Sequence, residues 1–125
     1  MKFIFTITCL LISHLSLGGL RVASYNIRNF DYDVRSNTPT NKSQLIKTIT
    51  EMNFDLLAIQ EINNTEEFAN IIKTNFNGKY ATILSECGGA HDQRLGFIYN
   101  TQKLKLLKFK EDMRTVHPGQ NQQHD

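Results

Sequence analysis

Two side chains with oxygen donors stand near the ends of two apolar segments, where they could serve metal-assisted phosphate chemistry. Asn26 lies near the end of Val22–Ile27, and Glu61 lies near the end of Asp55–Ile62. Carboxylate and amide oxygens are hard ligands, which Mg²⁺ accepts while it keeps several waters that a phosphate can displace. An asparagine after a strand is also often a turn residue, and a terminal glutamate is often simply solvated. The residue types alone therefore leave a metal site and a plain surface both open.

The segments that carry these residues predict a strand, a helix and a second strand. Val22–Ile27 mixes β-branched, aromatic and small residues, as extended strands do. Asn41 stands where a helix cap is expected, and a helical face follows with the apolar residues Leu45, Ile46, Ile49 and Met52. Asp55–Ile62 is a continuous apolar run, which is typical of a strand covered on both faces. A strand–helix–strand unit favours a parallel pair, whose carboxyl ends meet at the edge of a sheet where ligands collect.

The rest of the chain predicts a second helix and an antiparallel addition to this pair. Asn64 is the expected cap of the second helix. Strands are predicted at Lys79–Ser85 and Arg94–Asn100, and a short further strand is predicted at Lys103–Lys108. The polar stretch Arg28–Thr40 is predicted to be a loop. The overall prediction is an α/β protein with the order β-α-β-α-β-β.

Residues 1–18 have the pattern of a secretory signal peptide. Lys2 supplies a positive start, Phe3–Ile12 is nearly all apolar, and the small residues Ser16 and Gly18 follow at cleavage spacing. The apolar run is shorter than the ~20 residues that a membrane span needs, so no stable membrane association is expected. We therefore expect a secreted or periplasmic protein with a domain at 19–110 and a polar loop or truncated tail at 111–125. A formal net charge of +2 identifies no polyanionic partner.

Three segments resemble motifs of a known superfamily. These segments are Leu20–Arg28 (LRVASYNIR), Asp55–Ile62 (DLLAIQEI) and Leu95–Asn100 (LGFIYN). In order and spacing they resemble the N-terminal portion of the endonuclease/exonuclease/phosphatase superfamily, which is deoxyribonuclease-I-like, and the resemblance covers roughly Leu20 to Leu107. It implies the N-terminal half of a two-sheet α/β sandwich. It also implies a metal-dependent phosphodiesterase that uses Mg²⁺, or Mn²⁺ or Ca²⁺ in its place, and hydrolyses DNA.

The resemblance also assigns roles to individual residues. Glu61 would be the principal metal ligand, and Asn26 would sit beside it to orient the metal or the scissile phosphate. Arg94 and Tyr99 could approach the phosphate from the third motif. For these two residues the alternatives are ordinary, because an arginine that begins a strand is usually a surface charge and a tyrosine within a strand is usually half-buried.

The superfamily's general base is a histidine polarised by an aspartate, and it comes from later motifs. The chain contains no Asp-x-Asn segment, and His124-Asp125 has the wrong order for the terminal motif. His91 and His117 lie in polar stretches, where a solvated histidine is the default. The expectation is therefore a truncated enzyme with little or no activity of its own.

Two other functions remain open on the sequence. The chain could be a non-catalytic module that binds nucleic acid or another protein through the Asn26 and Glu61 edge. It could also belong to a phosphoinositide or sphingomyelin phosphodiesterase, because the superfamily includes both. The sequence shows no sign of an obligate protein partner.

Overall fold

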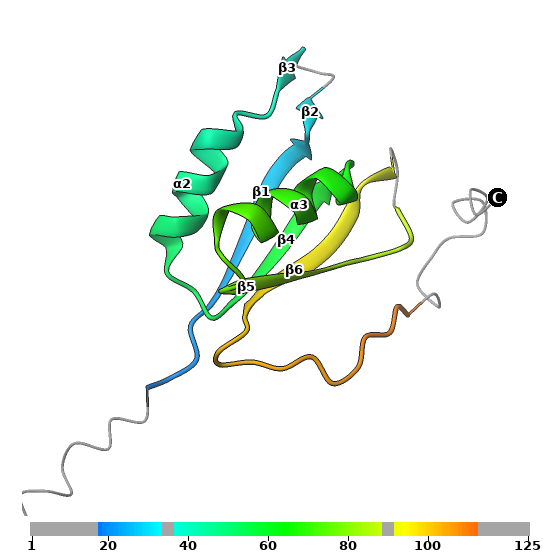
Figure 1. Cartoon of the computed structure of the whole chain (residues 1–125). Helices are drawn as coiled ribbons and strands as arrows, with labels where there is room; N and C mark the ends of the chain where they lie inside the picture. Colours follow the sequence, from blue (N-terminus) through cyan, green and yellow to red (C-terminus); the bar gives the residue numbers. More distant parts are fainter. Residues whose placement is uncertain (1–17, 34–36, 89–91, 113–125) are drawn as a thin grey trace, which may run out of the picture.

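A computed structural model describes residues 18–33, 37–88 and 92–112 of the chain (Figure 1). The predicted signal peptide at 1–18 lies outside the described residues except for Gly18. The three histidines considered above also lie outside them, as does the 111–125 tail beyond Asp112.

The described residues contain a four-stranded sheet in which a parallel pair adjoins an antiparallel pair. Its strands are β1 (Val22–Phe30), β4 (Leu56–Ile62), β6 (Arg94–Asn100) and β5 (Tyr80–Leu84), and they lie in that order across the sheet. β1 and β4 are parallel, while β4–β6 and β5–β6 are antiparallel. The predicted parallel unit and the predicted antiparallel addition are both confirmed.

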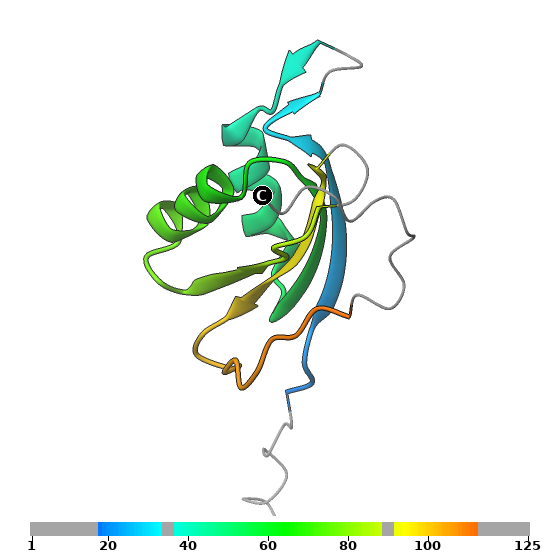
Figure 2. The same ribbon diagram turned by 90° about the vertical axis from the view of Figure 1, so that its right-hand side faces the viewer.

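Two helices cover one face of this sheet. α2 (Lys42–Met52) connects β1 to β4, and α3 (Thr65–Asn75) connects β4 to β5 (Figures 1 and 2). Each begins at its predicted asparagine cap: the side chain of Asn41 accepts a hydrogen bond from the amide of Gln44, and that of Asn64 accepts one from the amide of Glu67. Among the described residues, neither helix is long and apolar enough to cross a membrane.

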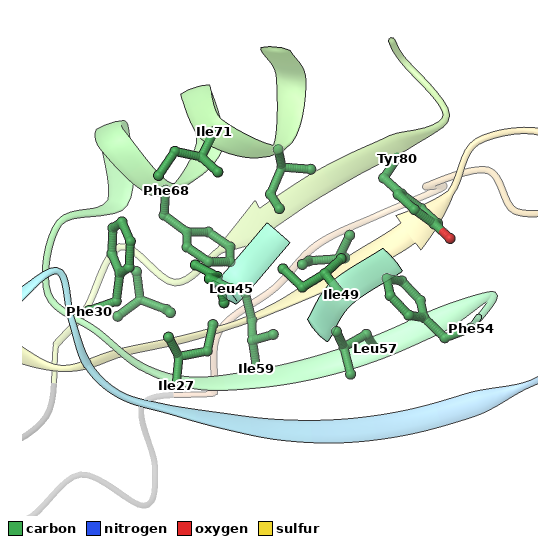
Figure 3. Packing of buried hydrophobic residues seen from close by; sticks show 13 residues of the cluster. Ile27, Phe30, Leu45, Ile49, Phe54, Leu57, Ile59, Phe68, Ile71 and Tyr80 are labelled. Carbon is green, nitrogen blue, oxygen red and sulfur yellow. The ribbon is translucent and has the colours of Figure 1, made fainter. Parts of the chain in front are cut away.

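The core lies between the helices and the sheet (Figure 3). The ring of Phe68 on α3 meets that of Phe30 on β1 edge to face, at 5.2 Å between centroids. Phe54 stacks on Tyr80 at 4.7 Å. Alternate strand residues point into the core, because side chains alternate between the two faces of a strand. The remaining buried apolar residues are Ile27, Leu45, Ile49, Leu57, Ile59, Ile62, Ile71, Ile72 and Ile98.

The prediction that Asp55–Ile62 is covered on both faces is wrong for the described residues. Leu57 and Ile59 are buried towards the helices, but Leu56 and Ala58 on the other face are only half-buried. The same open face carries Phe97, opposite Ala58, and Val22, opposite Leu56. Val22 is 64% exposed and Phe97 is 41% exposed. An apolar strand pattern does not distinguish a covered face from an uncovered one.

The prediction that Arg28–Thr40 is a loop is also corrected. β1 continues to Phe30, whose ring is fully buried, so the strand is three residues longer than predicted. A two-stranded antiparallel ribbon follows, made of β2 (Tyr32–Asp33) and β3 (Thr38–Pro39). The polar composition of Arg28–Thr40 did not predict these strands, because short edge strands carry few apolar residues.

The predicted strand at Lys103–Lys108 is absent: the described chain forms a turn at Thr101–Lys103 and then runs without regular structure to Asp112. In Figure 2 this orange segment crosses below the sheet, from the side of the helices towards the opposite side. Adjacent Leu106 and Leu107 interrupt the alternation of lysine and leucine, so the segment cannot keep one apolar face.

The α/β class is confirmed: in the described residues a mixed sheet is accompanied by two helices, and the elements follow the order β1-β2-β3-α2-β4-α3-β5-β6. The second sheet of a sandwich is not among the described residues, where the large sheet is accompanied by the ribbon alone.

Candidate metal centre

Asn26 and Glu61 lie together at the carboxyl edge of the parallel pair. In the β1–β4 register, Asn26 is the partner of Gln60, the residue before Glu61. The side-chain amide of Asn26 donates a hydrogen bond from Nδ2 to Oε1 of Glu61 at 2.8 Å. The structure therefore brings the two predicted site residues, 35 positions apart in the chain, into direct contact.

The backbone at this edge departs from regular strand geometry. The β1–β4 register shifts between Asn26 and Phe30, and the β4–β6 register shifts between Ile59 and Ile62. Within these irregular stretches Arg28 has φ 59°, Asn29 has φ 56° and Glu61 has φ 64°. Left-handed backbone is unfavourable for residues other than glycine, and it gathers at ligand sites where a bulge turns a side chain to a new direction.

The orientation of the Asn26 amide follows from its neighbours. The backbone N–H of Arg28 donates to Oδ1 of Asn26 at 2.8 Å. The carbonyl side of the amide therefore faces Arg28, and the NH₂ side faces Glu61. A carbonyl oxygen has two lone pairs, so Oδ1 can accept one further interaction. Asn26 thus holds the Glu61 carboxylate in place and keeps one acceptor position.

Arg94 lies beside this pair, at the start of β6. Its cross-strand partner is Ile62, the residue after Glu61. Nη2 of Arg94 contacts Oδ1 of Asp92 at 2.7 Å, and its side chain is 21% exposed. Nε is buried and has no hydrogen-bond partner in the described part of the chain. The charge of Arg94 is therefore paired with Asp92, while one buried N–H of its guanidinium lacks an acceptor, which is costly.

Gly88, in the loop before β6, packs closely against Asp92, the residue that pairs with Arg94. A Cβ added to Gly88 would lie 2.4 Å from Oδ1 of Asp92 and 2.8 Å from its Cα. Only glycine therefore fits at this position. The close approach holds the Asp92 carboxylate where it meets Arg94.

Tyr99 is not part of this cluster. It pairs with Leu56 at the beginning of β4, five residues before Glu61. At about 3.3 Å per residue, that separation corresponds to roughly 16 Å along the strands. Tyr99 is half-buried on the open face of the sheet. The structure therefore brings Arg94, but not Tyr99, to the edge where Asn26 and Glu61 meet.

Cys87, in the loop after β5, does not have the character of an activated nucleophile. Burial raises the pKa of its thiol, and the Glu111 carboxylate raises it further by hydrogen bonding and by charge. Glu111 accepts hydrogen bonds from the amides of Glu86 and Cys87. A reactive cysteine needs its thiolate form, which this environment disfavours.

The charged cluster around Asp55 lies at the other end of the strands. Asp55 is fully buried and receives the amide of Arg21 at 2.9 Å and Nζ of Lys103 at 3.0 Å. The Arg21 amide and then the Lys103 ammonium hold the pKa of this carboxyl well below its usual range. Asp55 already has two cationic partners, Arg21 and Lys103. Because Arg21 precedes β1 and Lys103 follows β6, these ion pairs link the start of β4 to both of those segments.

The donor set at the Asn26–Glu61 edge fits a hard cation with few protein ligands. The described residues contain no group of three or more histidine, cysteine, aspartate or glutamate side chains that could hold a metal ion. A closed structural zinc site would need such a group. Mg²⁺ is commonly held by one or two carboxylates and completes its shell with waters and phosphate oxygens. One carboxylate beside one amide matches that requirement.

Comparison of the chain with protein-family models found no match, and no curated protein matches it.

Sequence reasoning did not identify the polar residues behind the pair. Nε of Arg28 contacts Oδ2 of Asp33 at 2.8 Å, and Nδ2 of Asn29 contacts Oδ1 of the same carboxylate at 3.4 Å. Gln93 donates to Oδ1 of Asn29 from the loop before β6. Nothing in the sequence pattern marks these contacts, because they depend on the bulge at the end of β1.

Proposed function

We propose that this chain provides the metal-binding and phosphate-binding part of a Mg²⁺-dependent phosphodiesterase of the endonuclease/exonuclease/phosphatase type, with DNA as its substrate. The observation that carries the proposal is the contact between Asn26 and Glu61 at the carboxyl edge of a parallel strand pair. Ligands collect at such edges, and this one combines a carboxylate, an amide and an arginine.

Each residue has a separate task in this proposal. Glu61 holds the cation through its carboxylate, while Asn26 fixes the orientation of that carboxylate. Arg94 donates from Nε to an oxygen of the bound phosphate. When bound, Mg²⁺ would supply charge stabilisation for the phosphate and the leaving oxygen. Mn²⁺ or Ca²⁺ would fit the same oxygen ligands.

Exposed lysines after β6 support an extended polyanion as substrate. At the edge itself, the exposed side chain of Arg28 is already paired with Asp33. The segment after β6 carries exposed lysines at 105, 108 and 110, and it leads to Glu111, which is bound beside Cys87 in the loop that precedes Arg94. Lysines and arginines that neutralise backbone phosphates provide most of the affinity for DNA.

The described part of the chain contains no histidine, so it offers no histidine–aspartate pair to activate water. We therefore expect these residues to bind the cation and the phosphate without hydrolysis. The proposal also includes export, based on the signal-like pattern of residues 1–18. It includes a second sheet over the open face, where Val22, Leu95 and Phe97 are exposed apolar residues.

The experiment is fluorescence anisotropy of a labelled duplex DNA with the full chain, with and without Mg²⁺. We expect Mg²⁺ to strengthen binding, Glu61→Gln to abolish that gain, and Arg94→Gln to weaken binding in both conditions. Glu66→Gln is the matched control, because Glu66 is an exposed carboxylate on α3.

Three results would contradict the proposal or redirect it. A Mg²⁺ effect that survives Glu61→Gln would refute the metal centre. DNA binding that is equally strong without Mg²⁺ would favour a non-catalytic binding module. If the chain binds phosphoinositide or sphingomyelin vesicles in preference to DNA in the same assay, a phospholipid would replace DNA as the proposed substrate.

A further inference from the structure

A single buried carboxylate supports the bulge that carries the candidate metal centre. Asp33 on β2 is only 5% exposed. Its Oδ2 contacts Nε of Arg28 at 2.8 Å, and its Oδ1 contacts Nδ2 of Asn29 at 3.4 Å. One side chain therefore contacts two consecutive residues of β1.

Those two residues are the ones whose backbone needs support. Arg28 and Asn29 have φ values of 59° and 56°, so two neighbouring residues other than glycine are left-handed. L-residues disfavour this conformation because Cβ approaches the following carbonyl oxygen. Such a stretch persists only where surrounding contacts determine it.

The bulge in turn sets the direction of the metal-binding carboxylate. It places the amide of Arg28 2.8 Å from Oδ1 of Asn26, which leaves Nδ2 of Asn26 to hold Oε1 of Glu61 at 2.8 Å. A continuous path therefore leads from Asp33 through Arg28 and Asn26 to Glu61. Gln93 contacts Asn29 from the β6 side, so the bulge is held from both neighbouring segments.

We propose that Asp33 is a positioning residue for the metal centre and that it orients Glu61 through Arg28 and Asn26. This inference rests on the proposed function in that Glu61 is taken as the metal ligand. Residues behind a metal ligand commonly fix its orientation, and their loss weakens metal affinity by about 10-fold to 100-fold.

The first measurement needs no metal. In ¹⁵N-labelled full chain, the side-chain NH₂ resonances of Asn26 report whether its amide is held by Glu61. We expect Asp33→Asn to shift these resonances towards free-amide values and to remove their protection from hydrogen exchange. Asp92→Asn, which removes one carboxylate from the same edge, should leave them unchanged. Unchanged Asn26 resonances in Asp33→Asn would overturn the inference.

The second measurement uses Mn²⁺ alone, followed by electron paramagnetic resonance. We expect Asp33→Asn to weaken Mn²⁺ binding by about tenfold. In an Asn26→Ala background, the same substitution should have no additional effect, because the path passes through Asn26. An equal loss in both backgrounds, or an equal loss with Asp92→Asn, would overturn the inference.

Failure of the inference can be separated from failure of the proposed function. Wild-type chain that binds no Mn²⁺ would refute the metal centre, while the Asn26 resonances would still decide whether Asp33 positions the pair. If Asp33→Asn does not fold, Arg28→Gln tests the same path, because it removes the exposed guanidinium that contacts Asp33. Arg28→Gln should shift the Asn26 resonances, and their constancy would overturn the inference.

Discussion

The replacement of Gly96 by alanine tests the packing of the sheet that presents Asn26 and Glu61. Gly96 on β6 pairs with Leu84 on β5. A Cβ at this position would lie 2.3 Å from the carbonyl oxygen of Ile83 and 2.7 Å from Cδ2 of Leu84. Ordinary contacts begin at 3.4 Å, so β5 would have to move by about 1 Å at Ile83. The nearest atom belongs to the backbone, which cannot rotate away as a side chain can.

Such overpacking costs about 1–3 kcal/mol of the free energy of unfolding. In a domain of this size each kcal/mol corresponds to about 4–8 °C in Tm. The assay is urea denaturation followed by far-ultraviolet circular dichroism, because the chain has no tryptophan. Gly19→Ala is the control, since a Cβ there meets nothing within 4 Å. A Gly96→Ala free energy of unfolding within about 0.5 kcal/mol of wild type would refute the close approach of the two strands.

Three further substitutions test other parts of the structure by the same denaturation assay. Asp55→Asn should lower the free energy of unfolding at neutral pH and flatten the decline of that free energy below about pH 4. The reason is that the lowered pKa of Asp55 stabilises the fold above the ordinary carboxyl pKa, and this stabilisation is lost as pH falls towards the folded-state pKa. An unchanged pH profile would contradict this. Phe68→Ala should cost about 3–5 kcal/mol because the ring is fully buried, and a loss below about 1 kcal/mol would exclude its core position. Asn64→Ala should cost about 1 kcal/mol because it removes the acceptor for the Glu67 amide, and no loss would contradict the cap.

The elements that position the candidate site could be predicted from the sequence because their signals are local. Asparagine caps mark the starts of both helices, and the apolar runs Val22–Ile27 and Asp55–Ile62 each mark a strand. A short helical connection between two apolar strands favours parallel pairing, which places Asn26 and Glu61 at one edge. Their direct contact also depends on the bulge at the end of β1, which orients the Asn26 amide and which the sequence does not predict.

The features that could not be predicted depend on register and on irregular backbone. Tyr99 lies in the same strand as Arg94, but only the pairing of Tyr99 with Leu56 shows that it is far from Glu61. Asp33 contacts the β1 bulge through left-handed residues that no apolar pattern signals. The apolar residues of β4 predicted two covered faces, but one face is uncovered in the described residues. Apolar composition does not specify what packs against a strand.

We propose that Glu61 binds a divalent cation, and titration of the full chain with Mn²⁺ is the simplest test. Electron paramagnetic resonance measures the free Mn²⁺, and Mg²⁺ is then added as competitor. We expect a site from which Mg²⁺ displaces Mn²⁺, and we expect its Mn²⁺ affinity to fall by about tenfold or more in Glu61→Gln but not in Glu66→Gln. Equal Mn²⁺ affinity in wild type and Glu61→Gln would show that Glu61 is not the metal ligand.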